Sequence, residues 1–363
     1  MKTVVNRVVS IKGPGSVEVI GERPAELSPG SVRVRTLYSG ISAGTELTAY
    51  RGTNPYLTRR WDAANGLFVE GRTHLYPLTG WGYQEVGEVV EAAPDVTDPP
   101  LGSIVWGIWG HRGEAVVPAA KLAGHVLPPG ADPLTGVFAR VGAIALNAVH
   151  AAGIHLGDEL AVFGQGVIGL LATRLAVLNG ARVVAADAIP QRLALAKAYG
   201  AAEAFDVTSG SAAEFVRKLT GGVGADTAIE LSGNHAGLHE AIRTVRRGGR
   251  VVAAGFYQDG ALDLRLGEEF HHNQVQLVAS QISSVASWLV HRWDVPRLQR
   301  TFMDLAVAGR VDTAALVTHV VDVAEAAEVY AMIDRRPHEV LQVVFKFDSA
   351  SEQSTAPEES VQR

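Results

Sequence analysis

A glycine-rich turn and one acidic residue supply the first recognisable chemistry in this sequence. Gly164, Gly166 and Gly169 form a G-x-G-x-x-G pattern between an apolar run of strand length, Leu160 to Phe163, and a helical apolar run. Glycines in this pattern permit a tight turn, close approach of the backbone to a pyrophosphate, and close packing of the helix on the strand. A second apolar run ends at Asp187, roughly 20 residues on, where a carboxylate accepts hydrogen bonds from a ribose. The pattern predicts a dinucleotide-binding site.

The same stretch defines most of the expected cofactor contacts. The pyrophosphate is expected at the helix N-terminus, where free N–H groups and the helix dipole favour negative charge. The contacting residues expected here are Gly164, Gln165, Gly166, Val167, Ile168, Gly169 and Asp187. A carboxylate at this position repels a 2′-phosphate, so Asp187 favours NAD(H) over NADP(H). The alternative interpretation is an ordinary turn of an α/β protein.

The composition indicates two domains with a large apolar core. The chain has 363 residues, of which 47% are hydrophobic and 19% are charged. Its net charge of −6 argues against a nucleic-acid or anionic-membrane partner. It contains no cysteine, which excludes disulfides, thiolate catalysis and zinc sites built from thiolates. The N-terminus lacks a signal-peptide core and no apolar run is long enough to span a membrane, so we expect a cytoplasmic protein.

Two kinds of secondary-structure pattern follow one another along the chain. Residues 1 to about 130 read as short strands between Gly/Pro turns, among them Tyr83 to Glu91, and predict an all-β module. From Ala139, strands alternate with helices as far as the strand Val275 to Ser280, which predicts a parallel sheet. The chain then returns to mixed α+β, and its polar, acidic end, residues 349–363, is expected to be disordered.

Eight short motifs occur along the chain in a fixed order: YSGISAGTEL, GWGYQEVGEVVE, GSIVWG, GDELAVFGQGVIG, DAIPQRLALAKAYGA, DTAIELSG, RRGGRVVAAGF and EVLQVVFKF. Together they resemble the medium-chain dehydrogenase/reductase superfamily over about residues 1 to 348. The resemblance implies an α/β fold with a GroES-like β-barrel catalytic domain, residues 1–138 and 286–348, and a Rossmann doubly wound parallel-sheet domain, residues 139–285. It places nicotinamide in the cleft between the domains and implies a homodimer formed through the sheet edge at Val275 to Ser280.

The chain departs from the zinc-dependent members of that family at every ligand position. Where those members carry G-I-C-G-T-D, residues 40–46 read GISAGTE, without a thiolate. Their G-H-E motif is Gly82-Tyr83-Gln84 here, and the third ligand region, residues 140–143, offers no ligand. The four-cysteine structural zinc lobe is also missing between Trp109 and Lys121. The resemblance therefore implies a zinc-free branch, and we expect no metal.

Histidines are the remaining candidates for metal ligands. His74, His111 and His125 are isolated in the sequence, whereas His271 and His272 are adjacent. Neighbouring residues on a strand point to opposite faces, so this pair is poorly placed for joint ligation if it lies on a strand. Structural or substrate-facing roles are favoured for all five.

Hydride transfer without a metal needs hydrogen-bond donors and a proton source beside the reacting oxygen. Tyr83 stands where zinc-dependent relatives have their ligand histidine, so the resemblance implies that its hydroxyl faces the nicotinamide cleft; the alternative is a packed barrel tyrosine. Ser42 and Thr45 lie in the loop where relatives relay the alcohol proton. Tyr83, Ser42 and Thr45 are thus the predicted catalytic residues, and Glu46 and Gln84 are expected to hold their loop together.

The resemblance adds four cofactor contacts to the glycine turn. Arg192 matches a basic residue beside the ribose, and it leaves NADP(H) open because an arginine accommodates a 2′-phosphate. Ser232 and Gly255 follow strands whose carboxyl ends bind ligands in open α/β sheets. Gln342 stands where relatives place a pyrophosphate-binding arginine.

Two aromatic segments are predicted to cover the substrate. One lies between Thr48 and Leu78 and the other follows the last strand of the parallel sheet, and cleft-covering loops in this family tend to occur at the first position. The residues predicted to bind substrate are Tyr50, Tyr56, Trp61, Trp81 and Trp288. The alternative for both segments is a dimer contact.

The sequence therefore predicts an oxidoreductase that acts on a small molecule. The favoured chemistry is zinc-independent, NAD(P)H-dependent hydride transfer to an activated C=C bond of an enone or polyene, including reductive cyclisation in a biosynthetic pathway. The alternative is a metal-free alcohol or polyol (sugar) dehydrogenase. A catalytically inactive nucleotide-binding protein is a third alternative, against which the intact glycine pattern and Asp187 argue.

Overall fold

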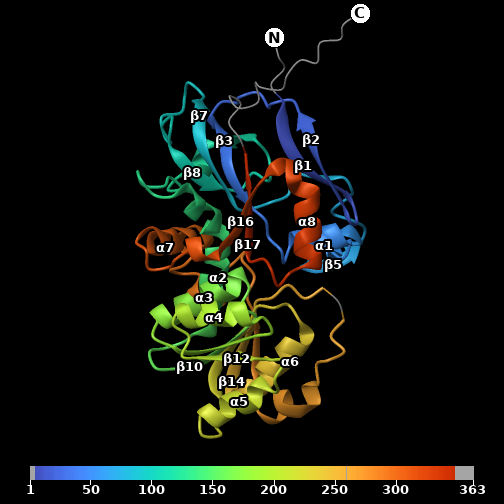
Figure 1. Ribbon diagram of the computed structural model, residues 1–363, viewed down its shortest axis with the longest axis vertical. Helices are drawn as coiled ribbons and strands as arrows, with labels where there is room; N and C mark the ends of the chain where they lie inside the picture. The colour runs from blue at the N-terminus through green and yellow to red at the C-terminus, as the bar shows by residue number, and fades with distance from the viewer. Residues whose placement is uncertain (1–4, 259, 348–363) are drawn as a thin grey trace, which may run out of the picture.

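The computed structural model describes residues 5–258 and 260–347, and the expected disordered tail, residues 349–363, lies outside them. Within the described residues, most strands belong to two large sheets, one in each half of the molecule (Figure 1), and the others form two smaller sheets. One sheet is parallel and the other is mixed. The α/β fold class expected from the sequence is confirmed.

Six parallel strands form the sheet in the lower half of Figure 1. Their spatial order is β12 (Glu203–Asp206), β11 (Arg182–Asp187), β10 (Glu159–Phe163), β13 (Ala225–Glu230), β14 (Val245–Ala253) and β15 (Gln276–Ala279). In β10, Leu160 and Val162 face one core while Ala161 and Phe163 face the other, because side chains alternate along a strand. The first face is covered by α2 (Ala139–Ala152), α3 (Val167–Leu178) and α4 (Pro190–Ala198), and the second by α5 (Ala212–Leu219) and α6 (His235–Thr244). This is the predicted doubly wound sheet.

A mixed sheet and a smaller one build the upper half of Figure 1. The mixed sheet contains β16 (Val317–Asp322), β17 (Gln342–Lys346), β3 (Ser31–Gly40), β7 (Glu85–Ala92), β8 (Ile104–Gly107) and β9 (Glu114–Pro118). The smaller sheet contains β2 (Ser16–Glu22), β1 (Asn6–Gly13) and β6 (Leu78–Thr79). Because β17 pairs with β3, the C-terminal segment returns to the N-terminal half. The boundaries proposed for the two domains remain a prediction.

Three further helices complete this half, namely α1 (Glu46–Arg51), α7 (Val295–Val307) and α8 (Ala326–Arg335). Helix α7 packs on α2, where Gly142 leaves room for the Phe302 ring: a Cβ added to this glycine would lie 2.2 Å from the ring.

The helical stretch Pro133–Ala152 is long enough and apolar enough, with a mean hydropathy of 1.3, to span a membrane. However, 72% of its most apolar 18 residues are buried inside the protein. Such burial is typical of a core helix.

The strand boundaries differ from the predicted ones at one point that matters for the site. Strand β7 begins at Glu85, so Tyr83 lies in the turn before the strand and not on it. Gly82 adopts a φ of +124°, a conformation that is strained for other residues. Because Tyr83 lies outside β7, the direction of its side chain is not set by the alternation of side chains along that strand.

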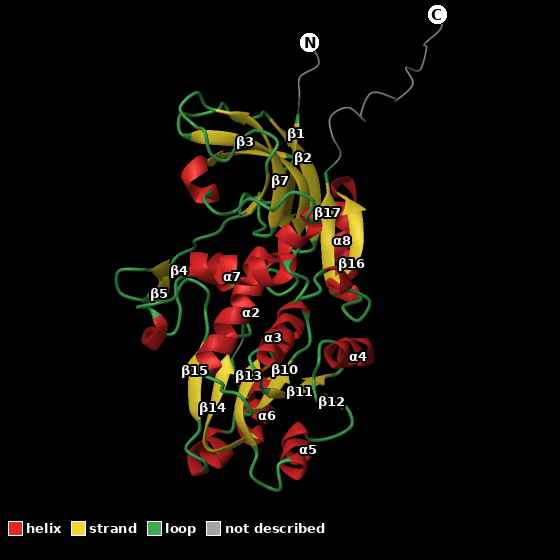
Figure 2. Cartoon of the chain, turned by 90° about the vertical axis from the view of Figure 1, so that its left-hand side faces the viewer, coloured by secondary structure: helices red, strands yellow, loops and turns green. Residues whose placement is uncertain are grey.

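Two stretches have more helix or strand than the sequence suggested. The segment between Thr48 and Leu78 holds the end of α1, a short helix Pro55–Leu57 and a hairpin of β4 (Arg59–Asp62) and β5 (Leu67–Glu70). Figure 2 shows this hairpin projecting from the body at the level where the two halves meet. His271 and His272 follow the helical turn Leu266–Phe270 and are themselves helical, so the argument from side-chain alternation on a strand does not apply to them.

Candidate functional site

The glycine turn has the geometry that its sequence predicts. Gly164 follows β10 with a φ of +83°, and a Cβ on it would lie 2.6 Å from the Ser232 backbone nitrogen. A Cβ on Gly169 would lie 1.8 Å from the Gly164 carbonyl oxygen, so α3 packs directly on the turn. Gly166, at the N-cap of α3, faces open space instead. A ligand can therefore approach the backbone at Gly166, where the helix N-terminus favours an anion.

Asp187 is held beside this turn at the carboxyl end of β11. It is 9% exposed, and its carboxylate accepts N–H hydrogen bonds from Gln165 at 2.5 Å and Ile189 at 2.9 Å. Strands β11 and β13 flank β10 on either side, so the turn lies where the strand order reverses. Open α/β sheets bind ligands at this switch point. The residues thus fit a dinucleotide, although the individual contacts remain predictions.

Arg192 lies near Asp187 but has a second task. Its Nη2 donates to the carbonyl oxygens of Pro337 at 2.7 Å and Val340 at 3.1 Å, which ties α4 to the loop before β17. Burial lowers the pKa of Arg192, and the neighbouring Asp187 carboxylate opposes this shift. The predicted contact of Arg192 with the ribose remains a prediction.

Ser232 and Gly255 meet at the carboxyl ends of β13 and β14 around a buried acid. Glu230 accepts hydrogen bonds from the backbone and hydroxyl of Ser232 and from the Tyr257 hydroxyl. A Cβ on Gly255 would lie 2.5 Å from the Gly233 nitrogen, so these loops approach closely. Burial raises the pKa of Glu230. This acid shapes the edge of the sheet next to the glycine turn.

The structure gives Gln342 a different contact from the predicted one. Gln342 is 1% exposed, and its Nε2 donates to the carbonyl oxygens of Ile41 at 3.0 Å and Val343 at 2.9 Å. Both amide hydrogens are thereby engaged, so none remains for a pyrophosphate. We correct this residue to one that ties β17 to the loop carrying Ser42.

The three predicted catalytic residues converge. The Tyr83 hydroxyl lies 2.5 Å from Ser42 Oγ and 3.4 Å from Thr45 Oγ1, with either partner able to donate. Ser42 is buried, Tyr83 and Thr45 are half-buried, and Ala43 and Gly44 of the same loop are exposed. The hydroxyls of Tyr83, Ser42 and Thr45, which we call the hydroxyl cluster, therefore lie between the buried interior and the exposed part of this loop.

A buried polar network holds this loop in place. Glu46 Oε1 accepts the Ser42 backbone N–H at 2.8 Å, and Glu46 Oε2 lies 2.7 Å from His111 Nε2. The Tyr330 hydroxyl donates to the same Oε2 at 2.5 Å, and His111 Nδ1 lies 2.5 Å from Ser39 Oγ. Glu46 and His111 are 1% and 0% exposed. The expected loop-holding role of Glu46 thus has a defined geometry.

Burial and charge set the protonation of these groups. Burial raises the pKa of Tyr83, and the hydrogen bond with Ser42 and the positive charge of Arg140 only partly oppose this rise. Burial alone lowers the pKa of His111, but the Glu46 carboxylate outweighs it and the net pKa is raised. At neutral pH Tyr83 is accordingly a neutral phenol, and the Glu46 carboxylate stabilises the protonated form of His111 relative to the neutral form.

The side chains around Tyr83 do not match a zinc site. Zinc takes thiolate, imidazole or carboxylate ligands, and this chain has no cysteine. Among the described residues, the neighbouring imidazole of His111 uses both nitrogens in the contacts to Glu46 and Ser39. Arg140, at the third ligand position, brings a positive charge close to Tyr83. No chemical step is assigned to zinc here.

The predicted substrate residues fall into two groups. Tyr56 and Trp81 are half-buried and Trp61 is 42% exposed, so all three remain candidates. Tyr50 is corrected to a core residue, because it is 7% exposed and its ring lies 5.8 Å from that of Tyr330.

Trp288 is also corrected. Its ring lies 5.1 Å from the Arg250 guanidinium, at the start of the paired part of β14, whereas ligands bind beyond Ala253 at the other end of the strand. Its packing on Arg250 therefore places it away from the carboxyl edge of the sheet.

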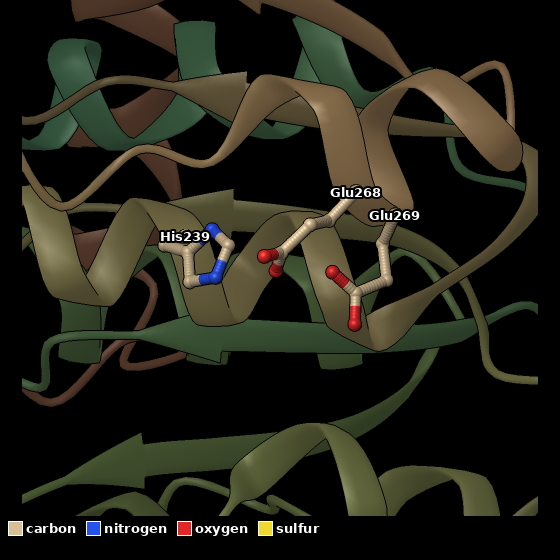
Figure 3. A group of neighbouring side chains, drawn as sticks. All are labelled: His239, Glu268 and Glu269. Atoms are coloured by element: carbon tan, nitrogen blue, oxygen red, sulfur yellow. The ribbon is translucent and has the colours of Figure 1, made fainter.

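One group of metal-ligating side chains occurs elsewhere among the described residues. The ligand atoms of His239, Glu268 and Glu269 lie within 4.8 Å of one another, on α6 and the adjoining helical turn (Figure 3). Arg243 Nε donates to Glu269 at 3.1 Å and already balances this carboxylate. We assign no metal to this group.

Two parts of the site were not predicted. The partners His111 and Tyr330 lie 65 and 284 positions from Glu46 in the sequence, and Thr53 Oγ1 donates to Gln258 at 2.5 Å across the two halves. The only sequence signal at His111 is an isolated histidine, which favours a structural or substrate-facing role over metal ligation but names no partner.

Comparisons with known proteins agree with this geometry. Residues 167–302 match the family model described as zinc-binding dehydrogenase. The chain is 28% identical over 327 residues to D-guloside 3-dehydrogenase of Shigella flexneri, covering 87% of this chain and 93% of that protein. It is 30% identical over 263 residues to L-threonine 3-dehydrogenase of Streptomyces avermitilis, covering 63% of this chain and 71% of that protein.

A solved structure extends the likeness to the whole fold. The chain matches a putative zinc-binding dehydrogenase from Sinorhizobium meliloti bound to NADP with a TM-score of 0.77 and 21% identity, covering 94% of this chain and 99% of the other.

The family model covers residues 167–302 and so includes none of positions 42, 83 and 140. Its name therefore does not bear on the side chains at these positions.

We predict that two alanine substitutions in the turn separate ligand binding from folding. Gly166→Ala adds a methyl group to open space, so thermal unfolding should be unchanged while NADH affinity falls about tenfold or more through overpacking of the ligand. Gly169→Ala places a methyl group against the Gly164 carbonyl and should reduce both. NADH fluorescence titration with parallel melting curves tests this, and wild-type affinity in Gly166→Ala would contradict the assigned pyrophosphate position.

Proposed function

The chain belongs to the medium-chain dehydrogenase/reductase superfamily, and from this premise we propose that it is a zinc-independent, NAD(H)-dependent dehydrogenase that interconverts a secondary alcohol of a sugar, polyol or glycoside with the corresponding ketone. The chain is an oxidoreductase with a nicotinamide cofactor and a small-molecule substrate. The observation that carries the finer proposal is the 2.5 Å contact between Tyr83 and Ser42 at a position without zinc ligands.

Zinc independence is supported by the chemistry of the replaced positions. A zinc enzyme polarises the reacting oxygen with a Lewis acid. This chain has a phenol and an aliphatic hydroxyl in that place, with Arg140 supplying positive charge nearby. Hydrogen-bond donors aimed at developing negative charge perform the same electrostatic task.

The proposed mechanism is simplest in the direction of carbonyl reduction. The reduced nicotinamide, when bound, supplies the hydride to the carbonyl carbon. The Tyr83 hydroxyl donates a hydrogen bond to the carbonyl oxygen and releases its proton as that oxygen gains charge. Ser42, 2.5 Å away, passes a proton to Tyr83 while it takes up another from solvent, to which the same loop is exposed at Ala43 and Gly44. Alcohol oxidation runs through the same groups in reverse.

Conjugate hydride addition to an enone is the second candidate. The observation in its favour is the raised pKa of Tyr83, because a neutral phenol is the proton donor that this reaction also needs. We place alcohol–ketone interconversion first, since a relative that aligns with 87% of this chain is named a D-guloside 3-dehydrogenase. A substrate panel that contains glycosides, polyols and enones separates the two.

The cofactor preference and the assembly are proposed on separate grounds. Asp187, fixed by Gln165 at the ribose end of the turn, supports NAD(H) over NADP(H).

Strand β15 is an edge of the parallel sheet and exposes Leu277, which supports a homodimer through this edge. The proposed location is the cytoplasm.

We predict that activity survives metal removal and depends on the phenol of Tyr83. After dialysis against a chelator, the purified enzyme with NAD+ and a glycoside or polyol substrate should retain its full rate. Tyr83→Phe should lower kcat by about 100-fold or more, because acid–base catalysis contributes about 10²–10⁴-fold.

The matched control for this experiment is Tyr38→Phe, which removes the hydroxyl of a half-buried tyrosine on β3. This variant should keep kcat within about twofold of wild type, because Tyr38 is not one of the proposed reacting groups and the loss of one hydroxyl changes the packing little. Activity that disappears with the chelator and returns with zinc would contradict the metal-free proposal.

We predict that Asp187→Ser shifts cofactor choice toward NADP(H). The substitution removes the charge that repels a 2′-phosphate and leaves Arg192 nearby, so the ratio of NADH to NADPH affinity should fall about tenfold. Asp206→Ser, the in-register neighbour on β12, is the control and should leave the ratio unchanged. Cofactor titrations measure both, and an unchanged ratio in Asp187→Ser would refute the assigned role of this carboxylate.

A further inference from the structure

Five rings form a continuous series that begins next to the hydroxyl cluster. The ring centroids lie 5.2 Å apart for Trp81 and His74, 5.4 Å for His74 and Tyr56, 5.3 Å for Tyr56 and Phe68, and 5.1 Å for Phe68 and Trp61. We call these five residues the aromatic strip. Each step is within the range of attractive aromatic contacts. The strip is longer than a single sugar ring.

The strip becomes more exposed with distance from the site. Trp81, two residues before Tyr83, is half-buried, as are His74 and Tyr56, whereas Phe68 and Trp61 are 39% and 42% exposed. Burial lowers the pKa of His74, so its ring is uncharged at neutral pH. The strip therefore presents an uncharged surface that runs outward from the reacting groups.

The backbone fixes the rings before any ligand arrives. Trp61 and Phe68 are direct partners across the β4–β5 hairpin, and Arg59 Nη2 donates to the Phe68 carbonyl at 2.8 Å. The Tyr56 N–H is capped by Asn54 Oδ1 at 3.0 Å, and the Tyr56 carbonyl accepts the His74 N–H at 3.0 Å. Preformed surfaces lose little entropy on binding a ligand.

The strip also lies at the junction of the two halves. Thr53, in the turn that leads to Tyr56, donates to Gln258 in the loop beyond the carboxyl end of β14. Figure 2 shows β4 and β5 projecting from the body at the level between the upper and lower sheets. The segment that carries Tyr56 is therefore tied to a loop of the parallel sheet.

We propose that the aromatic strip is a subsite for the apolar aglycone of a glycoside whose sugar ring reacts at Tyr83. This inference rests on the proposed function and extends it from a sugar to a sugar carrying an aromatic or other flat apolar group. Exposed rings joined to a site favour flat apolar ligands, since apolar and aromatic walls bury most of a ligand while a few polar groups orient it. The reacting sugar is oriented by the hydroxyls of Ser42, Thr45 and Tyr83, and the aglycone is held by the rings.

Equilibrium binding tests the strip without requiring turnover. The probes are the methyl and 4-nitrophenyl glycosides of D-glucose and D-gulose, titrated by calorimetry into the NADH-bound enzyme. The 4-nitrophenyl glycoside should bind about tenfold more tightly than the methyl glycoside of the same sugar, as expected for two aromatic contacts. In Trp61→Ala/Phe68→Ala this advantage should fall to about twofold or less, with methyl glycoside affinity unchanged.

Leu67→Ala is the matched control, because Leu67 is 59% exposed on the same hairpin and its side chain points to the opposite face from Phe68. It should keep the full aryl advantage. An aryl advantage that is absent in wild type, or that persists in the double variant, would overturn the proposal. The proposal would also be overturned if the double variant bound both glycosides like the wild type and differed only in its sedimentation coefficient, because the strip would then be a contact between copies of the chain. Failure of the proposed function is distinguished separately, because it appears as absence of sugar oxidation whatever the binding ratio.

Discussion

The contact between Glu46 and His111 is the interaction on which the site depends. It joins two ionisable side chains, 1% and 0% exposed, at 2.7 Å, and each has its remaining polar atoms engaged by Ser42, Tyr330 or Ser39. Removing one member of such a pair leaves an uncompensated buried charge and typically costs about 3–5 kcal/mol. The pair holds the Ser42 backbone, and Ser42 in turn holds the Tyr83 hydroxyl. A buried network of polar side chains thus supports the loop whose Ser42 contacts the Tyr83 hydroxyl.

The same loop is also restrained from the C-terminal part of the chain. Gln342 on β17 binds the Ile41 carbonyl, and Tyr330 on α8 binds Glu46, so both ends of the loop rest on elements that follow the parallel sheet in sequence. Arg192 joins α4 of that sheet to the loop before β17. The position of the reactive hydroxyls relative to the glycine turn is therefore set by the return of the chain to its N-terminal half. These contacts tie the loop that carries Ser42 and the helix α4 of the parallel sheet to the same C-terminal segment.

Local patterns were enough to predict the fold class and the glycine turn, because each depends on periodicity or on a motif within a few residues. The grouping of Tyr83 with Ser42 and Thr45 came from the family resemblance, since these partners lie 41 and 38 positions away in the sequence. Longer-range packing was not accessible in this way. The partners of Glu46 are 65 and 284 positions away, and no spacing rule connects them. Tyr50 was misassigned to the substrate, although its spacing of three from Leu47 on one helix face is typical of a core position. Gln342 was assigned by analogy, and only its two carbonyl partners revealed its structural role.

The central claim is that the phenol of Tyr83, and not a metal-bound water or alkoxide, controls proton transfer. The pH dependence of kcat for alcohol oxidation tests it most directly, measured for the wild type and for Tyr83→Phe. Because burial raises the pKa of Tyr83 above its ordinary value of about 10, the wild-type rate should keep rising through the alkaline range, and this rise should be absent in Tyr83→Phe. A profile governed by a pKa of about 7, as for zinc-bound water, and unchanged in Tyr83→Phe would contradict the account.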